Sequence, residues 1–143
     1  MKKHAGFTLV EMMIVVGLVG ILSAIAIPSY TAYVQRGKIA EAASQLSTMA
    51  VKLEQYFQDN RTYVGACAVN TVAALPTNTQ YFTYTCPVLT ATTFSVQAVG
   101  VASVGMTGFT YTIGPNNAKA TTSVPAGWTT NATCWVTRTG GIC

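Results

Sequence analysis

The sequence predicts an α+β protein in which one long helix near the N-terminus packs against an antiparallel β-meander. Three observations support this class. Apolar residues recur at helical spacing up to about residue 58, four later segments alternate with a period of two, and all four cysteines lie beyond residue 66. A chain of 143 residues has room for one domain, and a composition that is 50% hydrophobic and 8% charged excludes a disordered protein.

The chain begins with a short basic leader, residues 1–6, which is followed by an apolar segment at residues 7–27 whose single charge is Glu11. As a helix this segment would span about 32 Å, close to the roughly 30 Å hydrocarbon core of a bilayer. Lys2 and Lys3 would keep its N-terminal end cytoplasmic by the positive-inside rule, so the cysteine-bearing remainder would lie outside. The sequence therefore predicts a helix that can cross a membrane.

A cleaved secretory signal and an ordinary single-pass anchor remain alternatives for this segment. Ala24-Ile25-Ala26 reads like a signal-peptidase site. Two features argue against cleavage there, because Glu11 interrupts the passage from the basic to the apolar region and the helical pattern continues past Pro28. Pro28 lacks a backbone donor, so we expect a kink or a weak point, and residues 20–28 could unwind when the chain is packed into an assembly.

The helical pattern then becomes amphipathic. Apolar residues recur in steps of four and three, forming one stripe: Ile39, Ala43, Leu46, Ala50, Leu53 and Phe57. Glu41 and Glu54 fall off this stripe. We therefore expect a single helix over about residues 7–58, apolar on all sides in its first half and amphipathic in its second.

Beyond the helix, residues 63–80 read as a loop. Four segments rich in β-branched and aromatic residues follow, at 81–85, 93–99, 109–113 and 119–124, and residues 114–117 (Gly-Pro-Asn-Asn) predict a hairpin turn. Alternation predicts which side chains face the helix: Phe94, Val96, Ala98, Phe109, Tyr111 and Ile113.

The four cysteines favour disulfides and an oxidising compartment, because none of them forms a C-x-x-C pair. Three connectivities are possible, and pairing between neighbours, Cys67–Cys86 and Cys134–Cys143, closes the shortest loops. A four-cysteine zinc site is the alternative, although its ligands normally come in closely spaced pairs. We expect no metal and no cofactor.

The composition also argues against an enzyme. The single histidine is His4, and no Asp or Glu follows Asp59, so the second half lacks the usual groups for acid–base or triad catalysis; only serine–lysine chemistry stays open. The net charge of +4 is small and comes partly from residues 1–6. Without these residues, six basic residues would be present with four acidic ones, a net charge of +2. Strong sequence-independent binding of nucleic acid is therefore not expected.

The string Gly6-Phe7-Thr8-Leu9-Val10-Glu11, after a basic leader and before an apolar helix, resembles the type III signal of type IV pilins and pseudopilins. The resemblance implies a leader at 1–6, a membrane and filament-core helix at 7–30 and a globular head at 31–143. It implies cleavage after Gly6 and methylation of the Phe7 amine by a prepilin peptidase. It also implies residence in the inner membrane and then export by inner-membrane assembly machinery into an extracellular filament of other copies and minor pilins.

Glu11 supports this reading on physical grounds. A carboxylate at the centre of an apolar helix costs about 2.5–3.5 kcal/mol on insertion scales, so it needs a partner. Cleavage after Gly6 would expose an α-amine on Phe7, a cation that can pair with Glu11 of a neighbouring subunit. The alternative is that Glu11 lies in the headgroup region without a partner.

The cysteine segments, at residues 63–67 and 84–86 and at Cys134-Trp135 with Cys143, are similar to a pilin subfamily of major pilins and DNA-uptake minor pilins. Residues 135–142 would form the exposed loop known as the D-region. We expect a structural pilin for adhesion, twitching motility and DNA uptake. The alternatives are a minor pilin that binds DNA, or a type II secretion pseudopilin, whose calcium-bound loop this chain lacks. Candidate DNA contacts are Arg61, Lys119, Arg138 and Trp135, although the tryptophans could equally be packing residues.

Overall fold

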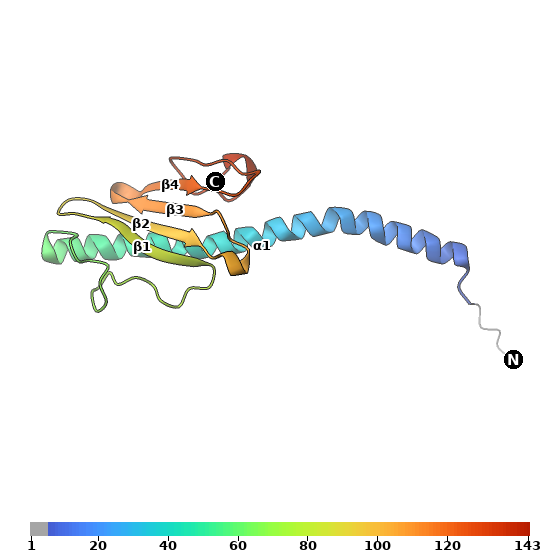
Figure 1. Cartoon of the computed structure of the whole chain (residues 1–143), viewed down its shortest axis with the longest axis horizontal. Helices are drawn as coiled ribbons and strands as arrows, with labels where there is room; N and C mark the ends of the chain where they lie inside the picture. The colour runs from blue at the N-terminus through green and yellow to red at the C-terminus, as the bar shows by residue number, and fades with distance from the viewer. Residues whose placement is uncertain (1–5) are drawn as a thin grey trace. The chain divides into compact units, whose positions relative to one another are not determined.

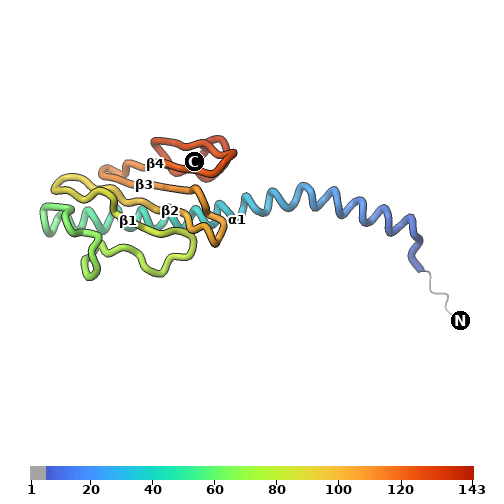
Figure 2. The backbone as a smooth tube through the Cα atoms, viewed as in Figure 1, coloured from blue at the N-terminus to red at the C-terminus, as the bar shows by residue number. Residues whose placement is uncertain are grey.

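The computed structural model describes residues 6–143, so Lys2, Lys3 and most of the expected leader lie outside the described residues. The chain divides into two units, one ending at Val34 and the other comprising Gln35–Cys143. The second unit therefore begins four residues later than the head expected from residue 31. Figures 1 and 2 show the order of the elements, in which one long helix precedes a four-stranded sheet.

Helix α1 comprises Leu9–Asn60 and belongs to both units. It begins and ends about two residues later than predicted. It continues through Pro28, whose carbonyl accepts a hydrogen bond from the Thr31 hydroxyl at 2.9 Å, so the proline does not interrupt the helix. None of the side chains at positions 6–34 is buried, and by length and composition α1 could cross a membrane.

The second unit contains an antiparallel sheet of β1 (Phe82–Leu89), β2 (Phe94–Gly100), β3 (Thr110–Gly114) and β4 (Ala118–Ser123), in that spatial order. The α+β class and the four-stranded meander are confirmed. Short 3₁₀ turns lie at Ala102–Val104, at Pro115–Asn117 between β3 and β4, and at Thr139–Gly141. β1 runs past its predicted end to Leu89 by way of a bulge between Thr85 and Val88.

The core lies between α1 and one face of the sheet (Figure 1). All six sheet residues predicted to face the helix are buried. On the helix, however, the buried positions are Ile39, Ala42, Leu46, Met49 and Leu53. The predicted stripe is confirmed at Ile39, Leu46 and Leu53, whereas its other members, Ala43, Ala50 and Phe57, are only partly buried at the edge of the core. Apolar residues occupy both neighbouring positions at 42–43 and 49–50, so periodicity alone could not decide which of each pair faces the sheet.

Two charged residues of α1 hold the segment just before β1 and the turn just after β2. The Glu41 carboxylate accepts hydrogen bonds from the backbone amides of Tyr81, at 3.1 Å, and Gln80, at 3.5 Å. The Lys38 ammonium donates to the Val104 carbonyl at 2.6 Å and lies 5.4 Å from the centre of the Tyr81 ring. A disulfide between Cys67 and Cys86 ties the irregular loop after α1 to β1. These contacts fix where the loop enters the sheet.

Candidate functional site

The expected assembly segment lies at the start of α1. Phe7 is 78% exposed and precedes the first helical residue, Leu9. The Glu11 amide donates to the Thr8 hydroxyl at 3.2 Å, and the Thr8 amide donates to the Glu11 carboxylate at 3.5 Å. This reciprocal pair is a capping box, which satisfies donors that the first turn of a helix otherwise leaves unpaired. The local role of Thr8 was missed, although Thr-x-x-Glu before an apolar run would have indicated it.

Glu11 is the only charged residue between Gly6 and Gln35. Its carboxylate is exposed and close to a side of α1 formed by Leu9, Met12, Met13 and Val16, where the surface is apolar. The capping box therefore gives the Glu11 carboxylate one local hydrogen bond, from the Thr8 amide, and none of the described residues 6–143 forms a salt bridge with it. A buried carboxylate needs a positively charged partner, and the sequence between Gly6 and Gln35 contains no cation.

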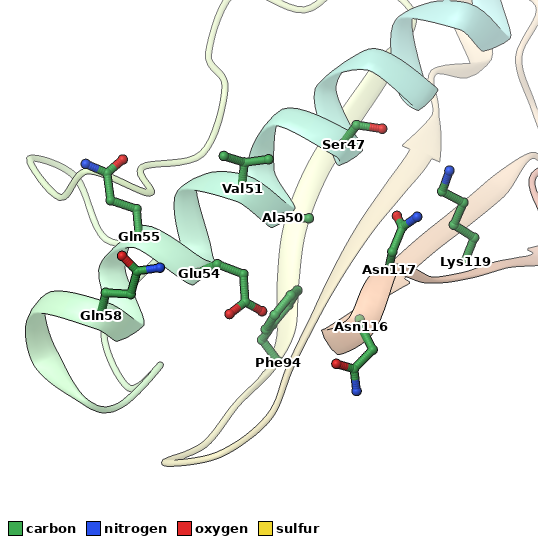
Figure 3. Close-up of a pocket in the computed structure, with 11 residues that line it drawn as sticks. Ser47, Ala50, Val51, Glu54, Gln55, Gln58, Phe94, Asn116, Asn117 and Lys119 are labelled. Carbon is green, nitrogen blue, oxygen red and sulfur yellow. The ribbon is translucent and has the colours of Figure 1, made fainter.

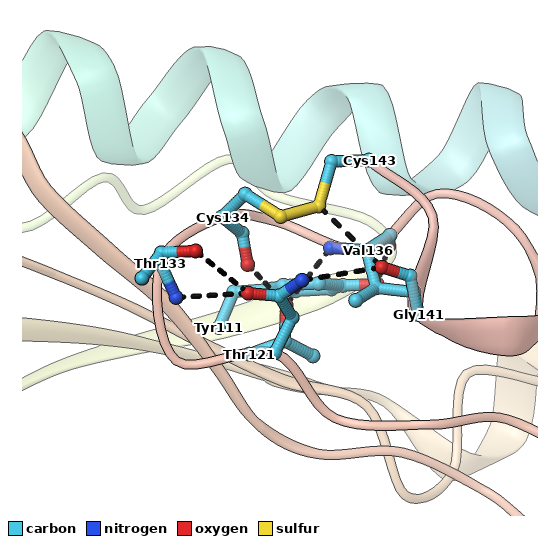
Figure 4. Close-up of a disulfide and its surroundings, with 8 residues drawn as sticks. Tyr111, Thr121, Thr133, Cys134, Val136, Gly141 and Cys143 are labelled. Carbon is cyan, nitrogen blue, oxygen red and sulfur yellow. Dashed lines mark hydrogen bonds between the residues drawn. A yellow bond between two sulfur atoms is a disulfide. The ribbon is translucent and has the colours of Figure 1, made fainter.

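The second candidate site is the C-terminal loop closed by the disulfide Cys134–Cys143 (Figure 4). The segment that leads into this loop extends the sheet beside β4, because Thr121 and Asn131 exchange backbone hydrogen bonds of 2.7 and 3.3 Å. The Asn131 side chain in turn donates to the Gly141 carbonyl at 3.2 Å. The segment after β4 is thereby held as a short additional edge of the sheet.

Thr121 is the centre of this attachment. It is 2% exposed, and its hydroxyl donates to the Cys134 carbonyl at 2.9 Å and accepts from the Val136 amide at 2.8 Å. The Tyr111 hydroxyl donates to the Val136 carbonyl at 2.9 Å, and burial raises the pKa of Tyr111 above its ordinary value. One threonine hydroxyl and one tyrosine hydroxyl thus replace the backbone ladder where β4 ends (Figure 4).

We expect Thr121→Val to destabilise the second unit by about 3 kcal/mol, because it keeps the shape but leaves a buried carbonyl and a buried amide unpaired. Denaturant unfolding followed by tryptophan fluorescence, with both disulfides intact, measures this loss. Thr122→Val is the matched control, since the neighbouring hydroxyl is exposed. Equal effects of the two substitutions would contradict the assigned role of Thr121.

The structure changes the interpretation of Trp135. Its ring is 9% exposed, its indole N–H donates to the Thr112 carbonyl at 2.9 Å, and the Lys119 ammonium lies 4.5 Å from the ring centre. A buried ring has no open face for a base, so the structure supports the packing alternative for Trp135, and a DNA contact of this residue stays a prediction. Trp128 is half-buried and makes an edge contact with Phe109 at 4.9 Å between ring centres. Both tryptophans are packing residues.

The remaining candidate DNA contacts are dispersed. Arg61 is exposed and follows α1 with a left-handed backbone, φ 56°, while Arg138 is exposed within the C-terminal loop. Figure 1 shows that the end of α1 and the C-terminal loop lie toward opposite ends of the sheet. Lys119 is the only charged residue in the sequence between Arg61 and Arg138. The structure therefore does not bring the three cations into one patch.

Among residues 6–143, no group of His, Cys, Asp or Glu is arranged to hold a metal ion. All four cysteines are paired, in the arrangement between sequence neighbours that closes the shortest loops.

Comparison with known proteins identifies relatives over most of the chain. The family model for "Type IV minor pilin ComP, DNA uptake sequence receptor" matches residues 28–134, and the model for the prokaryotic N-terminal methylation motif matches residues 1–27. The chain is 40% identical over 81 residues to a fimbrial protein of Pseudomonas aeruginosa, a match covering 57% of this chain and 48% of the relative. It is 44% identical over 62 residues to the type IV major fimbrial protein FimA of Dichelobacter nodosus, covering 43% of this chain and 35% of FimA.

These matches span about half the length of the curated relatives, or less. A solved structure of the non-core minor pilin PilV from Neisseria meningitidis has a similar fold, with a TM-score of 0.54 and 18% identity, over 65% of this chain and 91% of PilV.

Proposed function

The chain belongs to the family of the type IV minor pilin ComP, and from this premise we propose that it is a subunit of a type IV pilus. The exposed apolar start of α1 is the observation that supports this most directly. None of the side chains at positions 6–34 is buried, and the one charge there, Glu11, forms no salt bridge with any of the residues that the structure describes. A helix of this kind is stable in a bilayer or when packed among identical helices. The family is structural, in keeping with a chain expected not to be an enzyme.

We further propose the processing route that the methylation motif suggests. A prepilin peptidase and methyltransferase would cut after Gly6 and methylate the new amine of Phe7, which is exposed ahead of the helix. Before assembly, the subunit would reside in the inner membrane with its N-terminus in the cytoplasm. It would then join other copies and minor pilins in an extracellular filament. N-terminal sequencing and immunogold electron microscopy of sheared fibres test both steps, and fibres without this chain would oppose the proposal.

A second candidate function is DNA binding by the head during uptake, which the description of the matching family favours. Within the second unit, Arg61 and Arg138 are exposed cations on separate elements, and Lys119 is half-buried against Trp135. Two or three phosphate contacts provide modest, salt-dependent affinity. The geometry thus favours the pilus subunit first and the DNA contact second. We propose adhesion and twitching motility only as functions of the assembled pilus.

For the DNA contact we expect Arg61→Ala and Arg138→Ala each to lower the slope of log affinity against log salt by about 1, because each removes one phosphate contact. Gel shifts of the full chain in detergent, over a series of salt concentrations, measure this slope. Lys52→Ala is the control, since it removes the same charge from the side of α1. An equal loss with Lys52→Ala would show a general charge effect and oppose these two contacts.

A further inference from the structure

A groove of about 730 Å³ lies between the second half of α1 and the turn that joins β3 to β4 (Figure 3). One wall is formed by α1 side chains, the other by the turn, and Phe94 of β2 lies at the floor. All of its lining residues belong to the second unit. The principal lining residues are Val51, Glu54, Gln55, Gln58, Asn116 and Asn117.

The polar part of this lining is dominated by carboxamides, two from α1 and two from the turn. The charged lining groups are one carboxylate, Glu54, and one ammonium, Lys119. The Tyr63 hydroxyl donates to the Glu54 carboxylate at 3.1 Å, which orients that carboxylate from behind. In Figure 3 the Glu54 side chain points toward Phe94, whereas Lys119 points away from it. The groove is thus nearly neutral and rich in groups that both donate and accept hydrogen bonds.

The two asparagines of the turn have a left-handed backbone, and this backbone conformation does not depend on their side-chain amide groups. Asn116 and Asn117 have φ of 56° and 59°, the left-handed region that glycine adopts most readily. Both are exposed, and their side chains line the groove rather than the core. The backbone conformation therefore explains why a small or asparagine residue is found here, while the amides remain available to a ligand.

The chemistry of the lining selects among ligand classes. A phosphate chain is disfavoured, because the single ammonium is opposed by Glu54. An added β-strand is disfavoured as well, since the walls are a helix and a tight turn and offer no sheet edge. Hydroxyl groups match carboxamides and a carboxylate, and the apolar ring faces of a sugar match the 70% exposed Val51 and the half-buried Ala50, beneath which the buried Phe94 closes the floor. We propose that this groove binds a short, electrically neutral oligosaccharide.

The test uses the full chain in a detergent without a sugar headgroup, titrated by calorimetry with maltotriose, cellotriose and chitotriose, and with 3′-sialyllactose as the anionic comparison. We expect at least one neutral trisaccharide to bind with a Kd of about 1 mM or tighter. Gln58→Ala and Asn117→Gly should each weaken it about threefold to tenfold, the loss expected for one or two hydrogen bonds, and glycine preserves the left-handed turn. Glu54→Gln keeps an acceptor for Tyr63 while removing the charge.

Gln97→Ala is the matched control, because this amide lies on β2 between the buried positions 96 and 98, on the other face of the sheet. Binding that survives the groove substitutions, or no binding by any neutral trisaccharide, would overturn the proposal. A third result would also overturn it: the wild type binds no saccharide, and the groove variants are no longer incorporated into fibres. Another pilin would then fill the groove. Because the titration needs no filament, its failure is distinguishable from failure of the pilus assignment.

Discussion

Gly100→Ala is expected to destabilise the second unit strongly, because no room exists for a methyl group at the end of β2. A Cβ at this position would lie 1.9 Å from the Met106 carbonyl oxygen and 2.9 Å from its carbonyl carbon. That carbonyl cannot move freely, since Met106 donates to Val101 through its amide and accepts from Phe109 through its oxygen. Forcing backbone atoms apart in a close-packed interior costs about 3 kcal/mol or more, a large part of the stability of a small domain.

Near-UV circular dichroism of the full chain in detergent measures this loss, because both tryptophans lie in the second unit and report on its packing. Gly37→Ala is the matched control: a methyl group there meets no atom within 4 Å, and alanine favours helix over glycine by about 1 kcal/mol. The control should therefore unfold at the same or a higher denaturant concentration. If Gly100→Ala were as stable as the control, the backbone around Met106 would be able to move away from the added methyl group, contrary to this prediction.

Local patterns in the sequence predicted much of this fold. The β-branched and aromatic alternation located all four strands to within a few residues, and the Gly-Pro-Asn-Asn sequence located the turn between β3 and β4. The end of α1 was harder to predict, because Arg61 takes the left-handed position that usually belongs to glycine, with its amide 2.7 Å from the Phe57 carbonyl. Propensity identifies elements, while their exact ends depend on which backbone groups find partners.

Contacts between distant segments could not be predicted in the same way. Nothing near Thr121 in the sequence indicates that its hydroxyl bonds to Cys134 and Val136, because this depends on the path of the chain after β4. The same holds for Trp135, whose aromatic character predicted a binding surface but whose indole N–H is used by Thr112. Residue type indicates what a side chain can do, and tertiary packing decides whether it is available.

Several of the few charged residues of the second unit make structural contacts. Lys38 and Glu41 hold β1 and the turn after β2, and Lys119 lies over a buried ring. A domain with so few charges uses several of them in structural contacts, which leaves Arg61 and Arg138 as the exposed cations outside α1. This is why the head offers DNA a limited electrostatic surface, and why a neutral ligand suits the groove between α1 and the turn that joins β3 to β4.

Glu11→Ala is expected to lower incorporation of the chain into fibres about tenfold or more, while leaving membrane insertion and cleavage after Gly6 intact. The physical reason is the proposed pairing of the Glu11 carboxylate with the Phe7 amine of a neighbouring subunit in a weakly screened interior. Close charge pairs at interfaces couple by roughly 1.5–7 kcal/mol, and each 1.4 kcal/mol is a factor of ten. Quantitative immunoblots of sheared fibres against membrane-retained protein measure the change, and the mature N-terminus reports cleavage.

The capping box makes the choice of control decisive, because alanine removes both the charge and the hydrogen bond to the Thr8 amide. Glutamine can serve in a capping box but carries no charge, so Glu11→Gln should assemble as poorly as Glu11→Ala. Thr8→Val removes the hydroxyl that accepts from Glu11 yet keeps the carboxylate, and it should assemble nearly as well as the wild type. The opposite pattern, with glutamine tolerated and valine defective, would assign Glu11 to the start of α1 within its own subunit and refute the pairing between neighbours.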